Sequence, residues 1–207
     1  MNLSEALRRL FKNVLDSIAN FLKKAGLTPN AITLTALFGN LVAAILIANG
    51  KIQIGGVIVL LMGPLDAIDG AMARLGNQVT PFGAFLDSMS DRYSELAILG
   101  GLLFYFVQMH AWSACLLVYL AAVGSVLVSY ARARGESLGF SVKIGLLTRV
   151  ERYLVMAVSL ILNLPTVGLW IIAVLGNFTA IQRIWHVWRQ TNLSEKADCS
   201  LKNLERK

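Results

Sequence analysis

The stretch DAIDGAMARLGNQVTPFGAFLDSMSD, residues 66–91, places four aspartates between two long apolar runs. Asp66 and Asp69 are three residues apart, and Asp87 and Asp91 are four apart, so each pair shares one face of a helix. The intervening sequence LGNQVTP favours a turn. Antiparallel helices joined at this turn would hold all four carboxylates at similar depths, roughly 12 to 20 Å from its tip.

The remainder of the chain predicts an all-α integral membrane protein. It has 207 residues, is 56% hydrophobic and has a mean hydropathy of +0.63. Its apolar segments are long and continuous, which is typical of transmembrane helices and excludes the alternating pattern of a membrane barrel. We predict six transmembrane helices, the fifth being short, at residues 33–50, 53–75, 81–107, 112–134, 148–163 and 166–188.

The N-terminal residues 1–24 have the pattern of an amphipathic helix. Their apolar residues recur every three or four positions, at Leu3, Leu7, Leu10, Val14, Ile18 and Phe21. The segment is too charged to cross a membrane, so we expect it to lie in the cytoplasmic interface. The alternative is a helix that packs on the protein. Residues 1–190 then form a single domain, followed by a polar cytoplasmic tail at 191–207.

The distribution of positive charge predicts the orientation in the membrane. With six spans, 17 of the 19 lysines and arginines fall on one side, which includes both ends of the chain and the loop around Arg74. Short cytoplasmic loops carry this excess. We therefore expect a multi-pass protein of the cell membrane whose termini and aspartate-bearing turn are cytoplasmic.

Four ionised carboxylates in one membrane-embedded pocket would repel one another strongly, so a cation must balance them. Oxygen ligands in this number suit Mg²⁺ or Mn²⁺, and two such ions can clamp a phosphoryl group. A transporter for divalent cations or another substrate would also place acids inside a membrane. Helix packing alone is the weaker explanation, because four buried acids are costly.

The pattern D-x-x-D-G-x-x-A-R, eight residues, G-x-x-x-D-x-x-x-D at residues 66–91 resembles the full signature of the CDP-alcohol phosphotransferase family. The resemblance extends over roughly residues 25–190. It implies that a phosphoryl-linked lipid moves from a CDP-lipid to the hydroxyl of an acceptor, with release of CMP. Ion conduction would not require this Asp-Gly-x-x-Ala-Arg sequence and its fixed gap to Gly83.

The resemblance also implies roles for individual residues. Two divalent ions, Mg²⁺ or Mn²⁺, would be held by Asp66, Asp69, Asp87 and Asp91, and Asp91 would be the general base. The residues expected to contact the CDP-lipid are Pro29, Asn30, Ala31, Ile32, Gly70, Arg74, Thr80 and Gly83. For Arg74, an anchor at the cytoplasmic membrane surface is the plainer alternative.

Later basic residues indicate a phosphorylated acceptor. Guanidinium groups near the cytoplasmic helix ends suit phosphate binding, although they also satisfy the usual charge bias of such ends. The pattern is similar to the subgroup that makes phosphatidylinositol phosphate or archaetidylinositol phosphate from inositol 1-phosphate. Its Ser-x-x-Lys-x-Arg motif and two later arginines correspond here to Ser129, Arg132, Arg134, Arg152 and Arg183, with arginine in place of the usual lysine.

We therefore expect a CDP-alcohol phosphotransferase that uses inositol 1-phosphate. Glycerol 3-phosphate or another alcohol is the alternative acceptor, and a transporter is the alternative class. The expected partners are CDP-diacylglycerol or CDP-archaeol, inositol 1-phosphate, membrane lipids and a second copy of the chain, with no nucleic acid.

Overall fold

The structure is a computed structural model that describes residues 12–76, 79–142 and 144–204, with side chains described between residues 13 and 192 of those ranges. In these ranges the chain is helical and has no strand. Its helices are α2 (Lys12–Lys24), α3 (Pro29–Ala48), α4 (Ile52–Leu75), α5 (Pro81–Gln108), α6 (Trp112–Ser137), α7 (Arg149–Ile161) and α8 (Pro165–Leu204). The predicted starts of the six spans lie within four residues of the observed helix starts.

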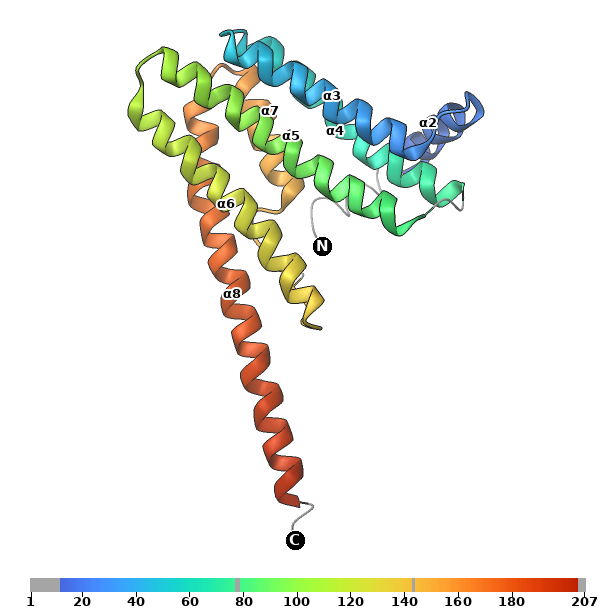
Figure 1. Ribbon diagram of the computed structural model, residues 1–207, viewed down its shortest axis with the longest axis vertical. Coiled ribbons are helices and arrows are strands. Elements are labelled where there is room, and N and C mark those ends of the chain that lie inside the picture. Colours follow the sequence, from blue (N-terminus) through green and yellow to red (C-terminus); the bar gives the residue numbers. More distant parts are fainter. Residues whose placement is uncertain (1–11, 77–78, 143, 205–207) are drawn as a thin grey trace.

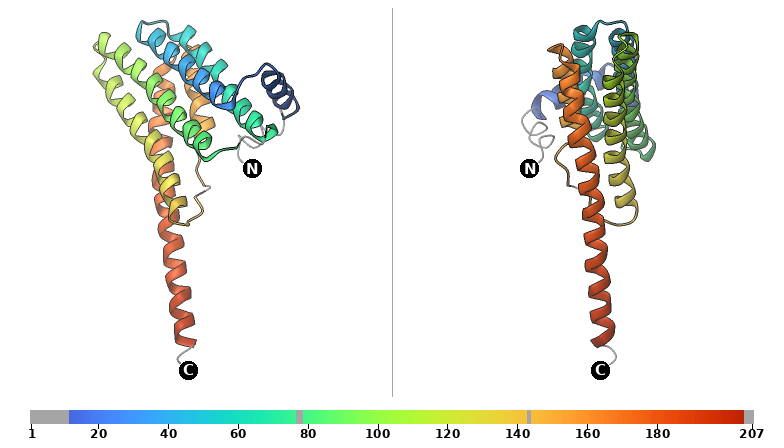
Figure 2. Two further views of the ribbon diagram at one scale, coloured as in Figure 1. Left: turned by 45° about the vertical axis from the view of Figure 1, so that its right-hand side comes forward. Right: turned by 90° about the vertical axis from the view of Figure 1, so that its left-hand side faces the viewer.

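The helices form two groups that α7 joins. α3 packs against α4 and α5, and α6 packs along α8 (Figure 1). α7 contacts α4 on one side and α8 on the other, and α5 contacts α6. The C-terminal part of α8 extends beyond the other helices (Figure 2). This arrangement brings α4, α5 and the start of α7 together, and those are the elements that carry the acidic stretch and its neighbours.

Two of the helices begin with the same Thr-Pro pair. Thr28 caps α3 by accepting a hydrogen bond from the Ala31 N–H at 3.3 Å, and Thr80 caps α5 by accepting one from the Gly83 N–H at 3.0 Å. A proline follows each threonine, at a position where the missing N–H breaks no helical hydrogen bond. The caps therefore fix the ends of α3 and α5 that lie beside the acidic stretch.

A glycine allows α3 and α5 to approach closely. A Cβ atom on Gly101 would collide with the Ala44 carbonyl group of α3, whereas a Cβ atom on the neighbouring Gly100 would meet nothing within 4 Å. Small residues permit such backbone contact between helices inside a membrane.

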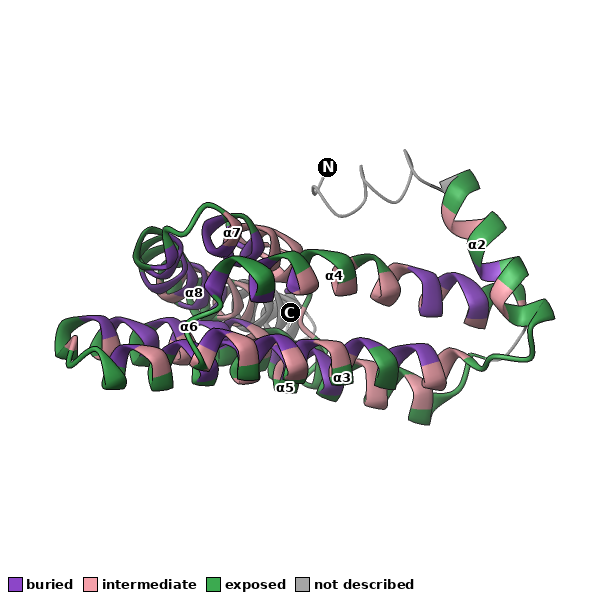
Figure 3. Ribbon diagram, turned by 90° about the horizontal axis from the view of Figure 1, so that it is seen from above, coloured by how far each residue is buried: buried purple, intermediate pink, exposed green. Residues whose placement is uncertain are grey.

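The burial of residues changes along α4. Buried residues lie near both ends of the helix, and residues 60–67 between them are more exposed (Figure 3).

Four helices among the described residues are long and apolar enough to cross a membrane, namely α3, α4, α6 and the part of α8 that ends at Asn192. Exposed apolar side chains such as Phe38, Ile45 and Trp170 occur along them, as expected for surfaces that face lipid. The chain is therefore a membrane protein. α5 carries four charged residues and α7 has only 13 residues, so their crossing of the membrane stays a prediction.

Some apolar residues of the N-terminal helix are buried against the protein, and others are exposed. Within α2, Ala19 is buried in a cluster with Ile68 and Met72 of α4, while Phe21 is 71% exposed. The packing alternative thus holds for one side of α2, and its position in the membrane interface stays a prediction. The predicted apolar positions in residues 1–11 lie outside the described residues.

The last helix extends beyond the predicted membrane span. We expected the final span to end near residue 188, but α8 continues to Leu204. Residues 189–204 contain neither proline nor glycine and include good helix formers such as leucine, glutamate, lysine and alanine, so nothing in them ends the helix.

Candidate active site

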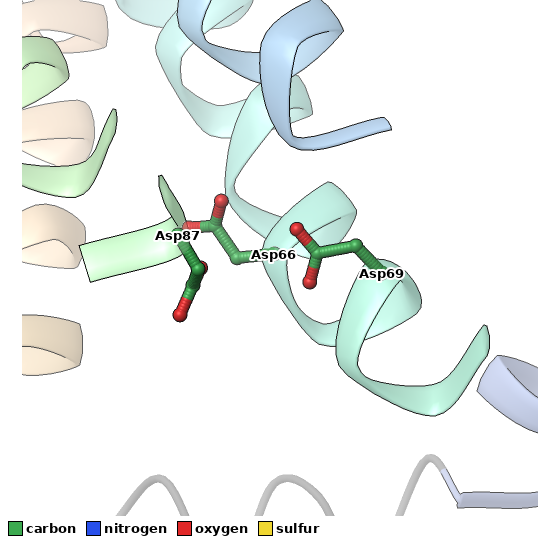
Figure 4. A group of neighbouring side chains, drawn as sticks. All are labelled: Asp66, Asp69 and Asp87. Atoms are coloured by element: carbon green, nitrogen blue, oxygen red, sulfur yellow. The ribbon is translucent and has the colours of Figure 1, made fainter. Parts of the chain in front are cut away.

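Three aspartates lie together where α4 and α5 face each other. Asp66 and Asp69 come from successive turns of α4, and Asp87 comes from α5 (Figure 4). One carboxylate oxygen of each residue lies within 4.8 Å of the other two. Asp69 is buried and the other two are half-buried. Three carboxylates so close together fit a hard divalent cation such as Mg²⁺ or Mn²⁺.

The carboxylate of Asp69 is held in place from α3. The hydroxyl of Thr33 donates a hydrogen bond to Asp69 Oδ2 at 2.6 Å, and both side chains are buried. A hydrogen bond to a charged carboxylate is strong and fixes its orientation toward the neighbouring ligands. Thr33 was not predicted as a site residue. A threonine in an apolar helix carries no sign of a partner 36 positions further along the chain.

The fourth aspartate faces an arginine. Asp91 is buried on α5, and its Oδ1 makes an ion pair with Nη2 of Arg149, the first residue of α7. The same nitrogen also pairs with Asp66 Oδ2. Arg92 lies further away, with its Nη1 at 3.7 Å from Asp91 Oδ2. Arg149 thus connects Asp66 of the first aspartate pair with Asp91 of the second. Arg149 was not predicted as a site residue, because basic residues are common at the cytoplasmic ends of membrane helices.

The residues predicted to contact the nucleotide gather beside this cluster. A Cβ atom on Gly83 would lie 3.0 Å from Thr80 Oγ1 and 3.3 Å from Asn30 Oδ1, so glycine allows the starts of α3 and α5 to approach closely. On α4, a Cβ atom on Gly70 would lie 3.4 Å from Nη1 of the exposed Arg74. The first turn of α3 contains the other predicted residues, Pro29, Ala31 and Ile32.

Arg152, a predicted phosphate ligand, is buried and makes three hydrogen bonds inside the protein. Its side chain is 1% exposed. Nε and Nη2 donate to the two carboxylate oxygens of Glu95 at 2.7 and 3.0 Å, and Nη1 donates to the Leu147 carbonyl oxygen at 3.4 Å. Such a two-point pair is geometrically specific. Glu95 was not predicted as a partner, because α5 and α7 meet only in the folded structure.

Arg183 is also buried, and it ties α8 to two other segments. Its Nη1 donates to the Val128 carbonyl oxygen at 2.6 Å, and its Nε donates to the Ile144 carbonyl oxygen at 2.9 Å. The charges of Arg132 and Arg152 act on the Arg183 guanidinium. The role of these arginines in binding a phosphate stays a prediction.

The other predicted phosphate ligands lie at the end of α6. Arg132 is exposed and pairs with Glu136 one turn later, with 2.9 Å between Nε and Oε1. Arg134 is exposed, and Ser129 is half-buried. The basic group therefore has two buried members with protein partners and two exposed members.

The fold and the carboxylate cluster together define a helical membrane enzyme with a candidate metal centre between two of its helices. The model of the CDP-alcohol phosphatidyltransferase family matches residues 26–185. The chain belongs to this family and is a CDP-alcohol phosphotransferase.

Two curated relatives cover most of the chain. An archaetidylinositol phosphate synthase of Pyrococcus horikoshii is 31% identical over 188 residues, which are 90% of this chain and 97% of the relative. A phosphatidylinositol phosphate synthase of Mycobacteroides abscessus is 32% identical over 189 residues, which are 86% of this chain and 84% of the relative. The enzyme is thus similar to synthases of inositol-containing phospholipid phosphates.

Solved structures of the Mycobacterium tuberculosis phosphatidylinositol phosphate synthase share the fold. The form with CDP-DAG bound matches with a TM-score of 0.79 and 30% identity, over 85% of this chain and 94% of that one. The form in complex with manganese and citrate matches with a TM-score of 0.78 and 31% identity, over 84% of this chain and 88% of that one. The manganese form and the carboxylate cluster both favour use of a divalent metal.

Proposed function

We propose that the protein transfers the phosphatidyl or archaetidyl group of a CDP-lipid to a hydroxyl of inositol 1-phosphate and releases CMP. The carboxylate cluster of Asp66, Asp69 and Asp87, with Asp91 one helical turn beyond, carries this proposal in a chain of this family. The names of the two relatives support inositol phosphate as the acceptor.

The four aspartates would hold two ions of Mg²⁺ or Mn²⁺. When bound, such ions neutralise the diphosphate and stabilise the leaving CMP. Thr33 keeps Asp69 oriented throughout. Asp91 accepts the proton of the attacking hydroxyl as the new oxygen–phosphorus bond forms and the bond to CMP breaks. A buried carboxylate suits this step, because water competes little for the proton.

The CDP part of the lipid is assigned to the neighbouring helix starts. Asn30, Thr80 and Gly83 come together there, and the absence of a side chain on Gly83 lets the polar groups of Asn30 and Thr80 approach its backbone. Gly70 and the exposed Arg74 would lie along the diphosphate, and the backbone of Pro29–Ile32 along the nucleotide. The CDP-DAG complex of the M. tuberculosis enzyme supports a CDP-lipid as the donor.

The phosphate of the acceptor is assigned to the arginine group. Arg132 and Arg134, being exposed, would meet it first, together with Ser129. Arg152 and Arg183 would form the inner wall, where Glu95 and three backbone carbonyl oxygens hold their guanidinium groups in place. Arginines fixed in this way lose little conformational entropy on binding a phosphate.

The same proposal covers topology and assembly. Residues 1–190 form one domain with six spans, α2 lies in the interface, and both termini, the tail and the active site are cytoplasmic, in accord with the charge distribution. The protein acts as a homodimer in the cell membrane. Glycerol 3-phosphate or another alcohol is the alternative acceptor for the same chemistry.

Release of CMP by the purified protein in lipid micelles tests the reaction. CDP-diacylglycerol and CDP-archaeol are each supplied with Mg²⁺ or Mn²⁺, and inositol 1-phosphate, glycerol 3-phosphate, inositol or serine is added separately. We expect CMP only with inositol 1-phosphate. Release with another acceptor would overturn the assignment of the arginines. Metal-dependent flux across proteoliposomes without any CMP would instead support a transporter.

A further inference from the structure

A single nitrogen atom lies between two of the four aspartates. Nη2 of Arg149 contacts Asp66 Oδ2 and Asp91 Oδ1, and the charge of Asp87 acts on the same guanidinium. Two of the four carboxylates therefore contact one positive group, and the charge of a third also acts on it. The Arg149 side chain is 35% exposed and that of Asp91 is 6% exposed, so water screens their attraction only in part.

Two other arginines, Arg92 and Arg74, lie near the aspartates, but neither bridges two of them. Arg92 approaches Asp91 only to 3.7 Å, and its Nη1 donates to the Ser88 carbonyl oxygen of its own helix at 2.6 Å. Arg74 is exposed beside Gly70. Arg149 alone among these three arginines joins a carboxylate of α4 to a carboxylate of α5.

Asp66 takes part in both the carboxylate cluster and the contact with Arg149. It belongs to the cluster with Asp69 and Asp87, whose oxygens already lie together, and it is also the partner of Arg149. A divalent ion among Asp66, Asp69 and Asp87 leaves the guanidinium its contact with Asp91. A second ion shared by Asp66 and Asp91 would have to occupy the place of Nη2, because two cations cannot share one gap.

We propose that Arg149 fills the position of the second cation in the metal-free enzyme and must withdraw when the second metal ion binds. The inference rests on the proposed use of two ions. It makes Arg149 a positioning residue that neutralises Asp66 and Asp91 and bridges them. The two ions then bind with different affinities, since the first leaves Arg149 in contact with Asp91 and the second must displace the guanidinium from that contact.

Binding of Mn²⁺ to the full-length protein in detergent, followed by electron paramagnetic resonance and calorimetry, tests this inference without any turnover. In wild-type protein we expect one tight and one weak ion. In Arg149→Gln the second ion should bind about 10-fold more tightly or better, since the amide does not compete as a cation. Arg149→Lys keeps a competing charge and should leave the second ion weak.

Arg92→Gln is the matched control, because it removes a positive charge beside the same Asp91 without emptying the gap. It should change the second dissociation constant by less than about threefold. An equal gain in Arg92→Gln and Arg149→Gln would show a general charge effect and overturn the inference. Unchanged or weaker binding of the second ion in Arg149→Gln would overturn it as well.

Thermal unfolding gives an independent measurement. Metal-free Arg149→Gln should melt below wild type, because its carboxylates are left without their cation, and saturating Mn²⁺ should raise its melting temperature more than it raises that of wild type. Equal metal-induced shifts would contradict the inference. Wild-type protein that binds one ion or none would instead remove the two-ion proposal on which the inference rests, while CMP release would still report on the reaction.

Discussion

Both carboxylate oxygens of Glu95 accept hydrogen bonds from Arg152, so that α5 and α7 are joined by a two-point ion pair inside the protein. The Arg152 side chain is almost entirely buried, and the Glu95 side chain is 19% exposed. The pair connects a residue one helical turn beyond Asp91 on α5 with a member of the arginine group assigned to the acceptor. Its integrity therefore affects both stability and the position of a predicted ligand of phosphate.

Glu95→Gln should destabilise the protein by about 3 kcal/mol, because it leaves the guanidinium of Arg152 buried without a negative partner. The measurement is thermal or denaturant unfolding in detergent. Glu136→Gln is the control, since it removes the partner of Arg132 in an exposed pair and should cost less than about 1 kcal/mol. Equal losses in the two variants would contradict the role of burial.

Thr33→Val should weaken metal binding by about 10-fold, because it removes the hydrogen bond to Asp69 without changing the shape of the side chain. Titration with Mn²⁺ measures the effect. Thr35→Val is the matched control, as its hydroxyl donates only to the Ala31 carbonyl oxygen of its own helix. Similar metal affinity in both variants would show that Thr33 does not orient the ligand.

Asp91→Asn should lower the rate of CMP release by about 100- to 10,000-fold, because an amide cannot accept the proton of the attacking hydroxyl. Single-turnover assays measure this rate, and binding of CDP-diacylglycerol should change little. Full turnover in Asp91→Asn would require another base. Loss of CDP-lipid binding in the variant would indicate a structural role for Asp91.

Arg134→Gln should raise the KM for inositol 1-phosphate by about 10-fold, through loss of a charged contact to phosphate, and leave the KM for the CDP-lipid unchanged. Because the Arg134 side chain is exposed, we expect the substitution to leave the stability of the protein unchanged. Arg189→Gln, another exposed arginine, should leave both constants unchanged. A parallel rise of both KM values in Arg134→Gln would argue against a phosphate pocket at the end of α6.

Gly101→Ala should destabilise the protein by about 1 to 3 kcal/mol, because the new methyl group meets the backbone of Ala44, which cannot move aside as a side chain would. Gly100→Ala is the control on the adjacent residue. It should be neutral or slightly stabilising, since alanine favours helix and has free space there. Unfolding in detergent compares the two.

Local patterns in the sequence explain which features could be predicted. The apolar runs locate the helix starts, and the spacing of Asp66, Asp69 and Asp87 predicts their meeting because helical geometry is regular. α8 continues beyond residue 188, where the predicted span ends, because that span was bounded by polarity, whereas helix formation depends on propensity as well.

Contacts between residues of different helices could not be predicted from local sequence patterns. Thr33, Glu95 and Arg149 each act on a residue in another helix, and each belongs to a common residue type in an unremarkable local context. The burial of Arg152 and Arg183 depends on which helices pack beside them. Such pairings follow from the assembled bundle, and no periodicity along the chain encodes them.

The ion pair between Asp66 and Arg149 joins residues 83 positions apart, which has a consequence for biosynthesis. At usual rates of translation, roughly 4 to 17 s separate the synthesis of the two residues. The aspartates of α4 and α5 are therefore synthesised before the arginine that pairs with Asp66 and Asp91. During that interval the nascent chain carries these carboxylates without the partner that they have in the folded protein.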